Sequence, residues 1–175
     1  MNAHGKERKY DISPKIKIAK NISSGTYLFR DIFEGFEDLL AVNNIFGGNA
    51  LRELSEVKVE VFPKEGFMGV SDEDGHIFAS QYYLNDGDEW CVYLDVIHEL
   101  VHVRQFKQGK NLFDPQFAYV DRPTEIEAYS VGVKEARRIG MTEVEIFDYL
   151  EVPWISSKEH RRLAKSAGLK INAKD

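Results

Sequence analysis

The chain has 175 residues, of which 43% are hydrophobic and 30% are charged, a balance typical of a globular domain long enough to bury a core. Its net charge of −6 argues against a nucleic-acid-binding protein with a broad basic surface. The single cysteine, Cys91, cannot form an internal disulfide, and we expect a buried structural thiol rather than a reactive one. Residues 1–10 are too polar for a signal peptide, and no apolar run approaches the roughly 20 residues that cross a bilayer. We therefore expect a cytoplasmic protein.

The first third of the chain predicts a strand and two helices. Residues 15–20 alternate between polar and apolar and predict a short strand whose lysines face solvent; a phosphate-binding patch is the weaker alternative. Apolar residues spaced three and four apart predict a helix over residues 27–46, ended by two glycines. It would pack behind a functional site, with binding of a partner as the alternative. Asn49 is a candidate cap for a short helix that ends at Leu54.

The next segments have the pattern of strands. Residues 57–62 alternate as a half-buried strand does, and residues 67–70 and 76–84 predict two more strands. We expect the three to form an antiparallel sheet. The acidic loop 71–75 between the last two lacks the spacing of an EF-hand, so a solvated hairpin is favoured over a calcium site.

A long helix is expected to begin near Glu89 and to end at Gly109. It has almost no polar face, which predicts a buried central helix. Within it, His98, Glu99 and His102 form the pattern H-E-x-x-H. Histidines four residues apart lie on the same helical face, so both imidazoles can bind one Zn²⁺. Glu99 can then accept a proton from a zinc-activated water; the alternative is a pair of histidines satisfied by hydrogen bonds beside a chance glutamate.

A catalytic zinc usually has three protein ligands, and Glu125 is the candidate for the third. Pro123 and Thr124 predict the start of a helix that runs over residues 124–139. Glu127 lies on the same helix, but two residues apart means about 200° around the axis. Only one of the two glutamates can therefore face the metal.

The H-E-x-x-H motif, followed by a glutamate that opens E-x-x-A on the next helix, resembles the gluzincin metallopeptidases, and most of all the small minigluzincin-type members. The resemblance covers residues 57–140. It implies an α+β, zincin-like fold in which a small antiparallel or mixed sheet packs on a backing helix and a central H-E-x-x-H helix. It selects Glu125 over Glu127 as the third ligand, and it implies an edge strand that holds a peptide substrate. Tyr129 stands where many gluzincins carry an aspartate.

The rest of the chain predicts an aromatic loop and two short helices. Residues 110–122 form the loop, which would either line a cleft, with Tyr119 as a candidate oxyanion donor, or cover the core. A capping box at Thr142 predicts a helix that ends at Leu150, and Ser156 or the next serine would cap a last helix. A DNA-binding helix-turn-helix is disfavoured by the acidic charge.

These patterns predict a zinc-dependent peptidase that acts on peptides or proteins and needs no nucleic acid or membrane. Glu99 would be the general base, and Tyr119 and Tyr129 would support the site. A non-catalytic, zinc-stabilised interaction module is the alternative, and a latent enzyme blocked by its own tail, residues 170–175, is a third hypothesis. We divide the single expected domain, residues 1–175, into a loose terminus (1–13), the sheet with the backing and H-E-x-x-H helices (15–109), a helical part with Glu125 (124–168) and a tail (169–175).

Overall fold

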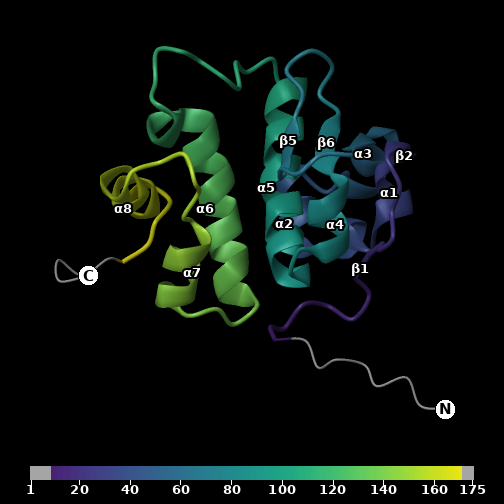
Figure 1. Cartoon of the computed structure of the whole chain (residues 1–175), viewed down its shortest axis with the longest axis horizontal. Coiled ribbons are helices and arrows are strands. Elements are labelled where there is room, and N and C mark those ends of the chain that lie inside the picture. Colours follow the sequence, from purple (N-terminus) through teal and green to yellow (C-terminus); the bar gives the residue numbers. More distant parts are fainter. Residues whose placement is uncertain (1–8, 171–175) are drawn as a thin grey trace.

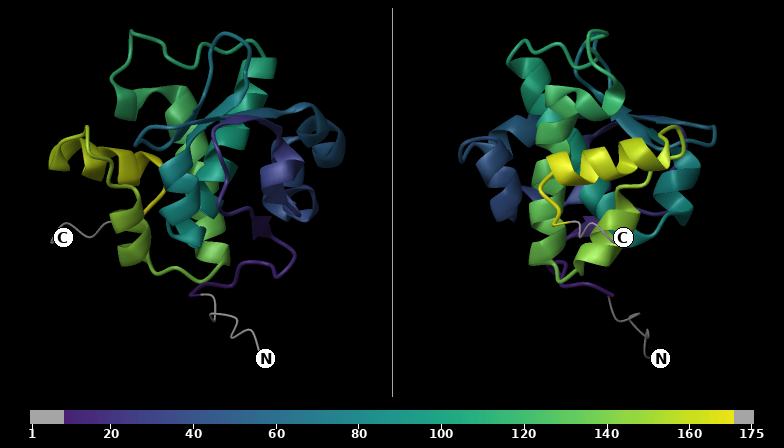
Figure 2. Two further views of the ribbon diagram at one scale, coloured as in Figure 1. Left: turned by 45° about the vertical axis from the view of Figure 1, so that its right-hand side comes forward. Right: turned by 90° about the vertical axis from the view of Figure 1, so that its left-hand side faces the viewer.

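The computed structural model describes residues 9–170 and has a mixed α+β fold (Figure 1). Helix α5 (Glu89–Lys107) runs through the middle. The sheet and several short helices lie on one side of it, and α6 (Pro123–Arg138) and the later helices lie on the other (Figure 2). No helix among the described residues is long and apolar enough to cross a membrane.

The remaining elements are short. The strands are β1 (Lys17–Ile18), β2 (Gly25–Leu28), β3 (Phe33–Glu34), β4 (Lys58–Phe62), β5 (Met68–Val70) and β6 (Ile77–Ser80). The helices on the sheet side are α1 (Phe29–Ile32), a 3-10 turn η1 (Phe36–Asp38), α2 (Leu40–Ile45), α3 (Ala50–Glu56) and α4 (Gln81–Asp86). After α5 come a 3-10 turn η2 (Tyr119–Asp121), α6, α7 (Glu143–Tyr149) and α8 (Ser157–Ser166).

The main sheet is mixed, with the strand order β2-β4-β6-β5. The pairs β2/β4 and β5/β6 are antiparallel, whereas β4 and β6 are parallel. The expected antiparallel sheet is therefore corrected at its centre. The chain leaves β4 for the outer strand β5 and turns back into β6, which lies between them. Because β6 is antiparallel to β5, which itself runs against β4, it is parallel to β4.

The expected backing helix over residues 27–46 is wrong. Its first residues pair with β4 as β2, and α1, β3, η1 and α2 follow in short pieces. Gly35 explains the break: its φ is +87°, and a Cβ there would lie 2.6 Å from the carbonyl oxygen of Lys15. A regular helix cannot contain that conformation. The apolar residues of this segment are nevertheless buried as their spacing predicts, because Phe29, Phe33 and Phe36 pack against one another in the core.

The predicted strand 76–84 ends early. Ser80 is the N-cap of α4, and its hydroxyl accepts a hydrogen bond from the amide of Tyr83. A serine side chain that satisfies an exposed amide in this way favours a helix start. The predicted short strand at 15–20 is reduced to β1, and Lys17 pairs with Glu34 at 2.8 Å rather than forming a basic patch.

Helix α5 is confirmed as a buried central helix. Nearly every side chain from Val92 to Val103 is buried, since the helix is covered by the sheet and α2 on one side and by α6 on the other. This packing leaves the histidines and Glu99 as the polar groups that must be satisfied inside the molecule.

The C-terminal helices follow their local signals. Thr142 and Ser156 both form capping boxes, with Glu145 and Glu159, at the starts of α7 and α8. The last described residues are not all tail, because Leu169 is buried.

The expectation of a loose N-terminus fails for residues 9–13. Tyr10 and Ile12 are buried, and the amide of Asp11 donates to the carbonyl of Ile139 at 2.9 Å. Residues 1–8, and the tail from residue 171 onward that was considered as a blocking segment, lie outside the described residues.

Candidate metal centre

Helices α5 and α6 bring the three predicted ligands together. The Nε2 atoms of His98 and His102 lie 3.0 Å apart. Oε2 of Glu125 lies 3.4 Å from the first and 3.5 Å from the second. All three side chains are buried and form a group that could hold a metal ion. The helical spacing of the histidines and the first turn of α6 thus meet as the sequence predicts.

The triangle of ligand atoms has the dimensions of a zinc site. Two atoms about 2.0–2.1 Å from zinc and at the tetrahedral angle lie about 3.3–3.4 Å apart. The three observed separations, from 3.0 to 3.5 Å, bracket that value. Two neutral imidazoles and one carboxylate are also the donor set of many catalytic zinc sites. Both the spacing and the chemistry therefore fit a zinc ion.

Buried polar atoms without partners support the same fit. Oε2 of Glu125 and Nδ1 of His98 are buried and make no hydrogen bond within the described residues. A buried carboxylate oxygen without a donor is costly. Hydrogen bonds within the described residues therefore leave Nδ1 of His98 and Oε2 of Glu125 unsatisfied, and a cation beside Glu125 would supply the partner that its oxygen lacks.

A buried amide fixes the ring of His102. Gln105 donates from Nε2 to the carbonyl of Thr124 at 3.0 Å and to Glu127 at 2.8 Å. Because both of these atoms are acceptors, the amide oxygen must face Nδ1 of His102, which lies 2.8 Å away. Nδ1 then carries the hydrogen, and Nε2 presents its lone pair to the centre.

Glu127 supports this arrangement from outside. It points away from the centre, as expected, and its basic partners are Arg104 at 2.7 Å and Lys110 at 3.0 Å. No motif or periodicity predicted its contact with Gln105, since the two residues lie on different helices and 22 positions apart in the chain.

The acid–base state of the ligands follows from their burial. Burial alone would lower the pKa of His102, but Glu125 and Glu99 outweigh it and raise this pKa to about 9. Burial would raise the pKa of Glu125, yet the two histidines, whose Nε2 atoms lie 3.4 and 3.5 Å from Oε2, hold it far below its usual range. The raised pKa of His102 favours its protonated form beside the Glu125 carboxylate in the metal-free protein, and a metal must displace that proton.

Glu99 is the predicted general base. Its side chain is 7% exposed and makes no hydrogen bond or ion pair within the described part of the chain. Burial raises its pKa, partly offset by the two histidines. A carboxylate with a raised pKa is a better proton acceptor near neutral pH than a solvated one.

The two candidate tyrosines contact each other. The hydroxyls of Tyr119 and Tyr129 lie 2.7 Å apart, and the ring of Tyr129 packs edge-on against His98 with centroids 4.4 Å apart. Tyr129 therefore contacts His98 as a ring and leaves Nδ1 of this histidine without a hydrogen bond. Burial raises the pKa of both phenols, so both remain protonated.

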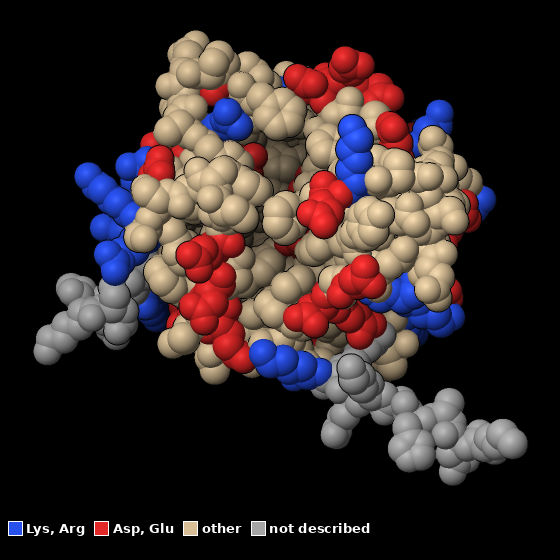
Figure 3. Space-filling model, in the orientation of Figure 1, with Lys and Arg blue, Asp and Glu red and all other residues tan. Residues whose placement is uncertain are grey.

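Two cavities reach the centre. A smaller one of about 190 Å³ adjoins all three ligands and is lined by β5 and by Phe113 and Tyr119 of the loop 110–122, so that part of the loop forms a wall. A larger one of about 470 Å³ adjoins His98 and Glu99 and extends along α5. Figure 3 shows a hollow on this face of the molecule.

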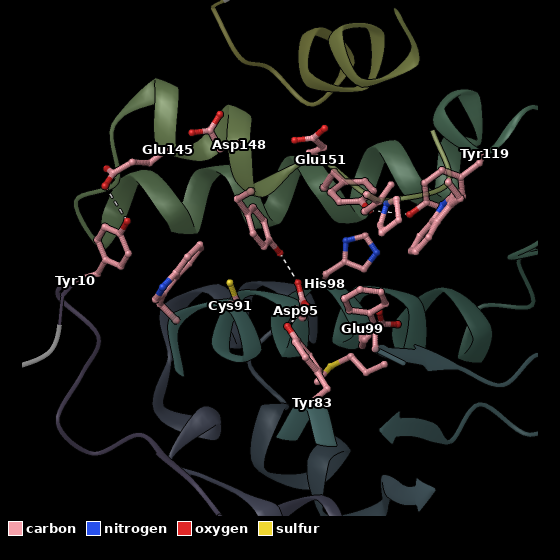
Figure 4. Close-up of a pocket in the computed structure, with 18 of the residues that line it drawn as sticks. Tyr10, Tyr83, Cys91, Asp95, His98, Glu99, Tyr119, Glu145, Asp148 and Glu151 are labelled. Atoms are coloured by element: carbon pink, nitrogen blue, oxygen red, sulfur yellow. Dashed lines mark hydrogen bonds between the residues drawn. The ribbon is translucent and has the colours of Figure 1, made fainter. Parts of the chain in front are cut away.

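Figure 4 shows the larger cavity running from Tyr10 and Glu145 at one end to His98 and Tyr119 at the other. Cys91 lies along it and is only partly buried, so the expected position in the core is corrected. Burial and then the charges of Asp95 and Asp88 raise the pKa of Cys91 to about 12, which keeps it a thiol.

The other histidines do not join the centre. His76 pairs with Asp74 and Glu60 at the loop 71–75. His160 stacks on Phe147 and lies 2.8 Å from its carbonyl oxygen. His4 lies outside the described residues.

No protein-family model matches the sequence, and neither a curated protein nor a solved structure matches it. The function must therefore be argued from the residues of the site.

Proposed function

We propose that this protein is a zinc-dependent peptidase of the gluzincin type, with a zincin-like arrangement of its helices and sheet. The observation that carries the proposal is the buried triangle of His98, His102 and Glu125 beside the unpartnered carboxylate of Glu99. A structural zinc site needs only the ligands, whereas a hydrolytic one also needs a base that can reach the attacking water.

The ligands and the base have separate tasks. His98, His102 and Glu125 would hold the ion, with His102 oriented through Gln105. Zinc bound there would supply a Lewis acid that polarises a carbonyl group and lowers the pKa of water. Glu99 takes the proton from the attacking water and delivers it to the leaving amine. Burial, which raises the pKa of Glu99, suits it to both transfers.

The edge of the sheet is an observation in favour of a peptide substrate. Within the described residues β5 pairs only with β6, and Met68, Gly69 and Val70 line the smaller cavity beside the ligands. An extended peptide can add to such an edge through main-chain hydrogen bonds. A peptide held there passes over the metal centre and Glu99.

One contact favours a gated or non-catalytic state as the second candidate. The rings of Phe67 and Trp154 meet edge-on with centroids 6.0 Å apart, and both line the larger cavity. They come from opposite sides of it, before β5 and after α7. A bulky substrate can enter only if these two rings separate. If they never separate, the protein would be a non-catalytic, zinc-stabilised module.

The test combines metal content with turnover. We expect about one zinc per chain by elemental analysis, removed by chelators and missing in a His98→Ala variant. The zinc-loaded protein should cleave members of a peptide library read by mass spectrometry. Glu99→Gln should keep its zinc and lose cleavage by about 10²–10⁴-fold, while Glu73→Gln, an exposed control on the loop 71–75, should match the wild type.

Stoichiometric zinc without cleavage of any library member would favour the non-catalytic module. Full turnover by Glu99→Gln would remove this residue from the role of base.

A further inference from the structure

The larger cavity has a strongly uneven charge. The acidic side chains that line it are Asp95, Glu99, Glu145, Asp148 and Glu151, and Lys9 is the one lysine or arginine of the described residues among its lining. Lys9 is paired with Glu145 at 3.3 Å, and the hydroxyl of Tyr10 donates to the same carboxylate. The cation and one carboxylate therefore offset each other at the far end of the cavity.

Asp95 lies on the wall nearest the metal centre. Its carboxylate accepts hydrogen bonds from the hydroxyls of Tyr83 and Tyr149, which come from α4 and α7 (Figure 4). No lysine or arginine of residues 9–170 pairs with it. Burial raises the pKa of Asp95, while the hydrogen bonds from the two phenols lower it and hold the carboxylate in place, so a cation bound beside it would favour its charged form.

The mouth of the cavity adds negative charge. Asp148 and Glu151 are exposed on α7 and the segment after it, and neither forms an ion pair within the described residues. In Figure 4 both side chains lie on the α7 side of the cavity, opposite Cys91 and Asp95 of α5. A ligand that enters between these helices meets carboxylates at the mouth and again on the wall.

The walls between the carboxylates are aromatic. Trp90 and Tyr149 meet edge-on with centroids 6.1 Å apart, and Trp154 packs against Tyr119 in the same way at 5.8 Å. Ring faces attract a cation and also cover the alkyl chain that carries it. An anion would meet five carboxylates and one lysine that is already paired with Glu145, and an apolar group would leave Asp95 without a counter-charge.

The cavity is continuous with the reaction centre. Glu99 is 7% exposed, unpartnered among the described residues, and lines both cavities. Asp95 precedes it by four residues on α5, which places the two about 6 Å apart along one helical face. This separation would let a substrate side chain lie at Asp95 while the peptide bond next to it lies beside Glu99.

We propose that this cavity binds the positively charged side chain of a lysine or arginine next to the peptide bond that is cleaved, with Asp95 as the specificity-determining residue. The inference rests on the proposed peptidase function and names its substrate class. The carboxylates at the mouth attract the cation, the aromatic rings cover its alkyl chain, and Asp95 pairs with the charged end.

Binding can be measured apart from turnover. The chain has two tryptophans, and both Trp90 and Trp154 line the cavity, so intrinsic fluorescence reports its occupancy. The probes are three N-acetylated hexapeptides that differ at one central position, which is lysine, norleucine or glutamate. They are titrated into zinc-loaded Glu99→Gln protein with and without Asp95→Asn, and Glu73→Gln serves as the control for loss of a distant charge.

We expect the lysine peptide to bind at least about tenfold more tightly than the norleucine peptide and the glutamate peptide to bind weakest. Asp95→Asn should reduce the lysine preference to about threefold or less, whereas Glu73→Gln should leave it intact. Equal binding of lysine and norleucine peptides would overturn the proposal, and so would an undiminished preference in Asp95→Asn.

Two further measurements separate the sources of failure. A preference that appears only when the peptides carry a free N-terminus would assign the cavity to a terminal amine and overturn the side-chain proposal. Cleavage of the library by the wild type without a preference for basic residues would overturn this inference and leave the peptidase proposal standing. Selective binding of the lysine peptide without any cleavage would support the cavity assignment and defeat the peptidase proposal.

Discussion

Replacing Gln105 with methionine tests how the metal centre is held. The side chain is fully buried, and its amide links His102 to the carbonyl of Thr124 and to Glu127. Methionine has a similar length and fills the same space, but it neither accepts from Nδ1 of His102 nor donates to the other two groups. The change therefore removes the orientation of one ligand without creating a large cavity.

The magnitude follows from the lost hydrogen bonds. Loss of the group that orients a metal-binding histidine typically costs about 10–100-fold in metal affinity, which corresponds to about 1.4–2.7 kcal/mol. The free energy of unfolding of the metal-free protein should also fall by about 1–3 kcal/mol, because Nδ1 of His102 becomes buried without a hydrogen-bond partner. For a chain of this size that is a fall in Tm of roughly 2–10 °C.

Competition with a chelating dye measures zinc affinity, and thermal unfolding with and without chelator measures stability. Gln105→Glu is the matched control. It keeps an acceptor for His102 but sets a carboxylate against Glu127 and the Thr124 carbonyl, so it should bind zinc better than Gln105→Met while being no more stable. A folded Gln105→Met protein whose zinc affinity is within twofold of the wild type would refute the orienting role.

Three further outcomes are expected. Glu125→Gln should weaken zinc binding by at least about 100-fold and Glu127→Gln by less than about tenfold; the opposite order in the dye assay would overturn the ligand assignment. Because a proton held by His102, with its pKa near 9, competes with the ion, apparent zinc affinity should rise with pH between 6 and 8, and a flat profile would contradict that proton. Gly75→Ala should cost about 2 kcal/mol or more, because Gly75 has a φ of +77° and a Cβ would collide with an aromatic ring of α5. Gly109→Ala, with a φ of +73° and open space around it, is the control and should melt at a higher temperature than Gly75→Ala.

Local signals predicted the helices that carry the candidate site. The apolar run around His98 and the capping boxes at Thr142 and Ser156 act within a few residues, and α5, α7 and α8 follow them closely. The grouping of the three candidate ligands could be anticipated for the same reason: helical spacing places His98 and His102 together, and a proline marks the turn that presents Glu125.

What the sequence concealed depends on distant contacts. Residues 27–46 have a helical apolar pattern, but Gly35 and pairing with β4 divide them, and the glycine inside the pattern was the available warning. Gln105 and Asp95 read as ordinary polar residues until α6 and α7 bring Glu127 and Tyr149 to them. Pairings of this kind join separate helices, so no periodicity records them.

The hydrogen bond between Tyr10 and Glu145 joins residues 135 positions apart. Closing so long a loop is entropically costly, and contacts of high sequence separation form late in folding. We therefore expect this end of the molecule to be completed last and to open first in local fluctuations. Tyr10 also packs on Trp90 with ring centroids 5.5 Å apart, so each such opening releases one end of the acidic cavity while α5 and the ligand triangle stay folded. Exchange of the peptides proposed to bind at the cavity would then be governed by Tyr10 and its contacts rather than by the helices that bear the candidate metal ligands.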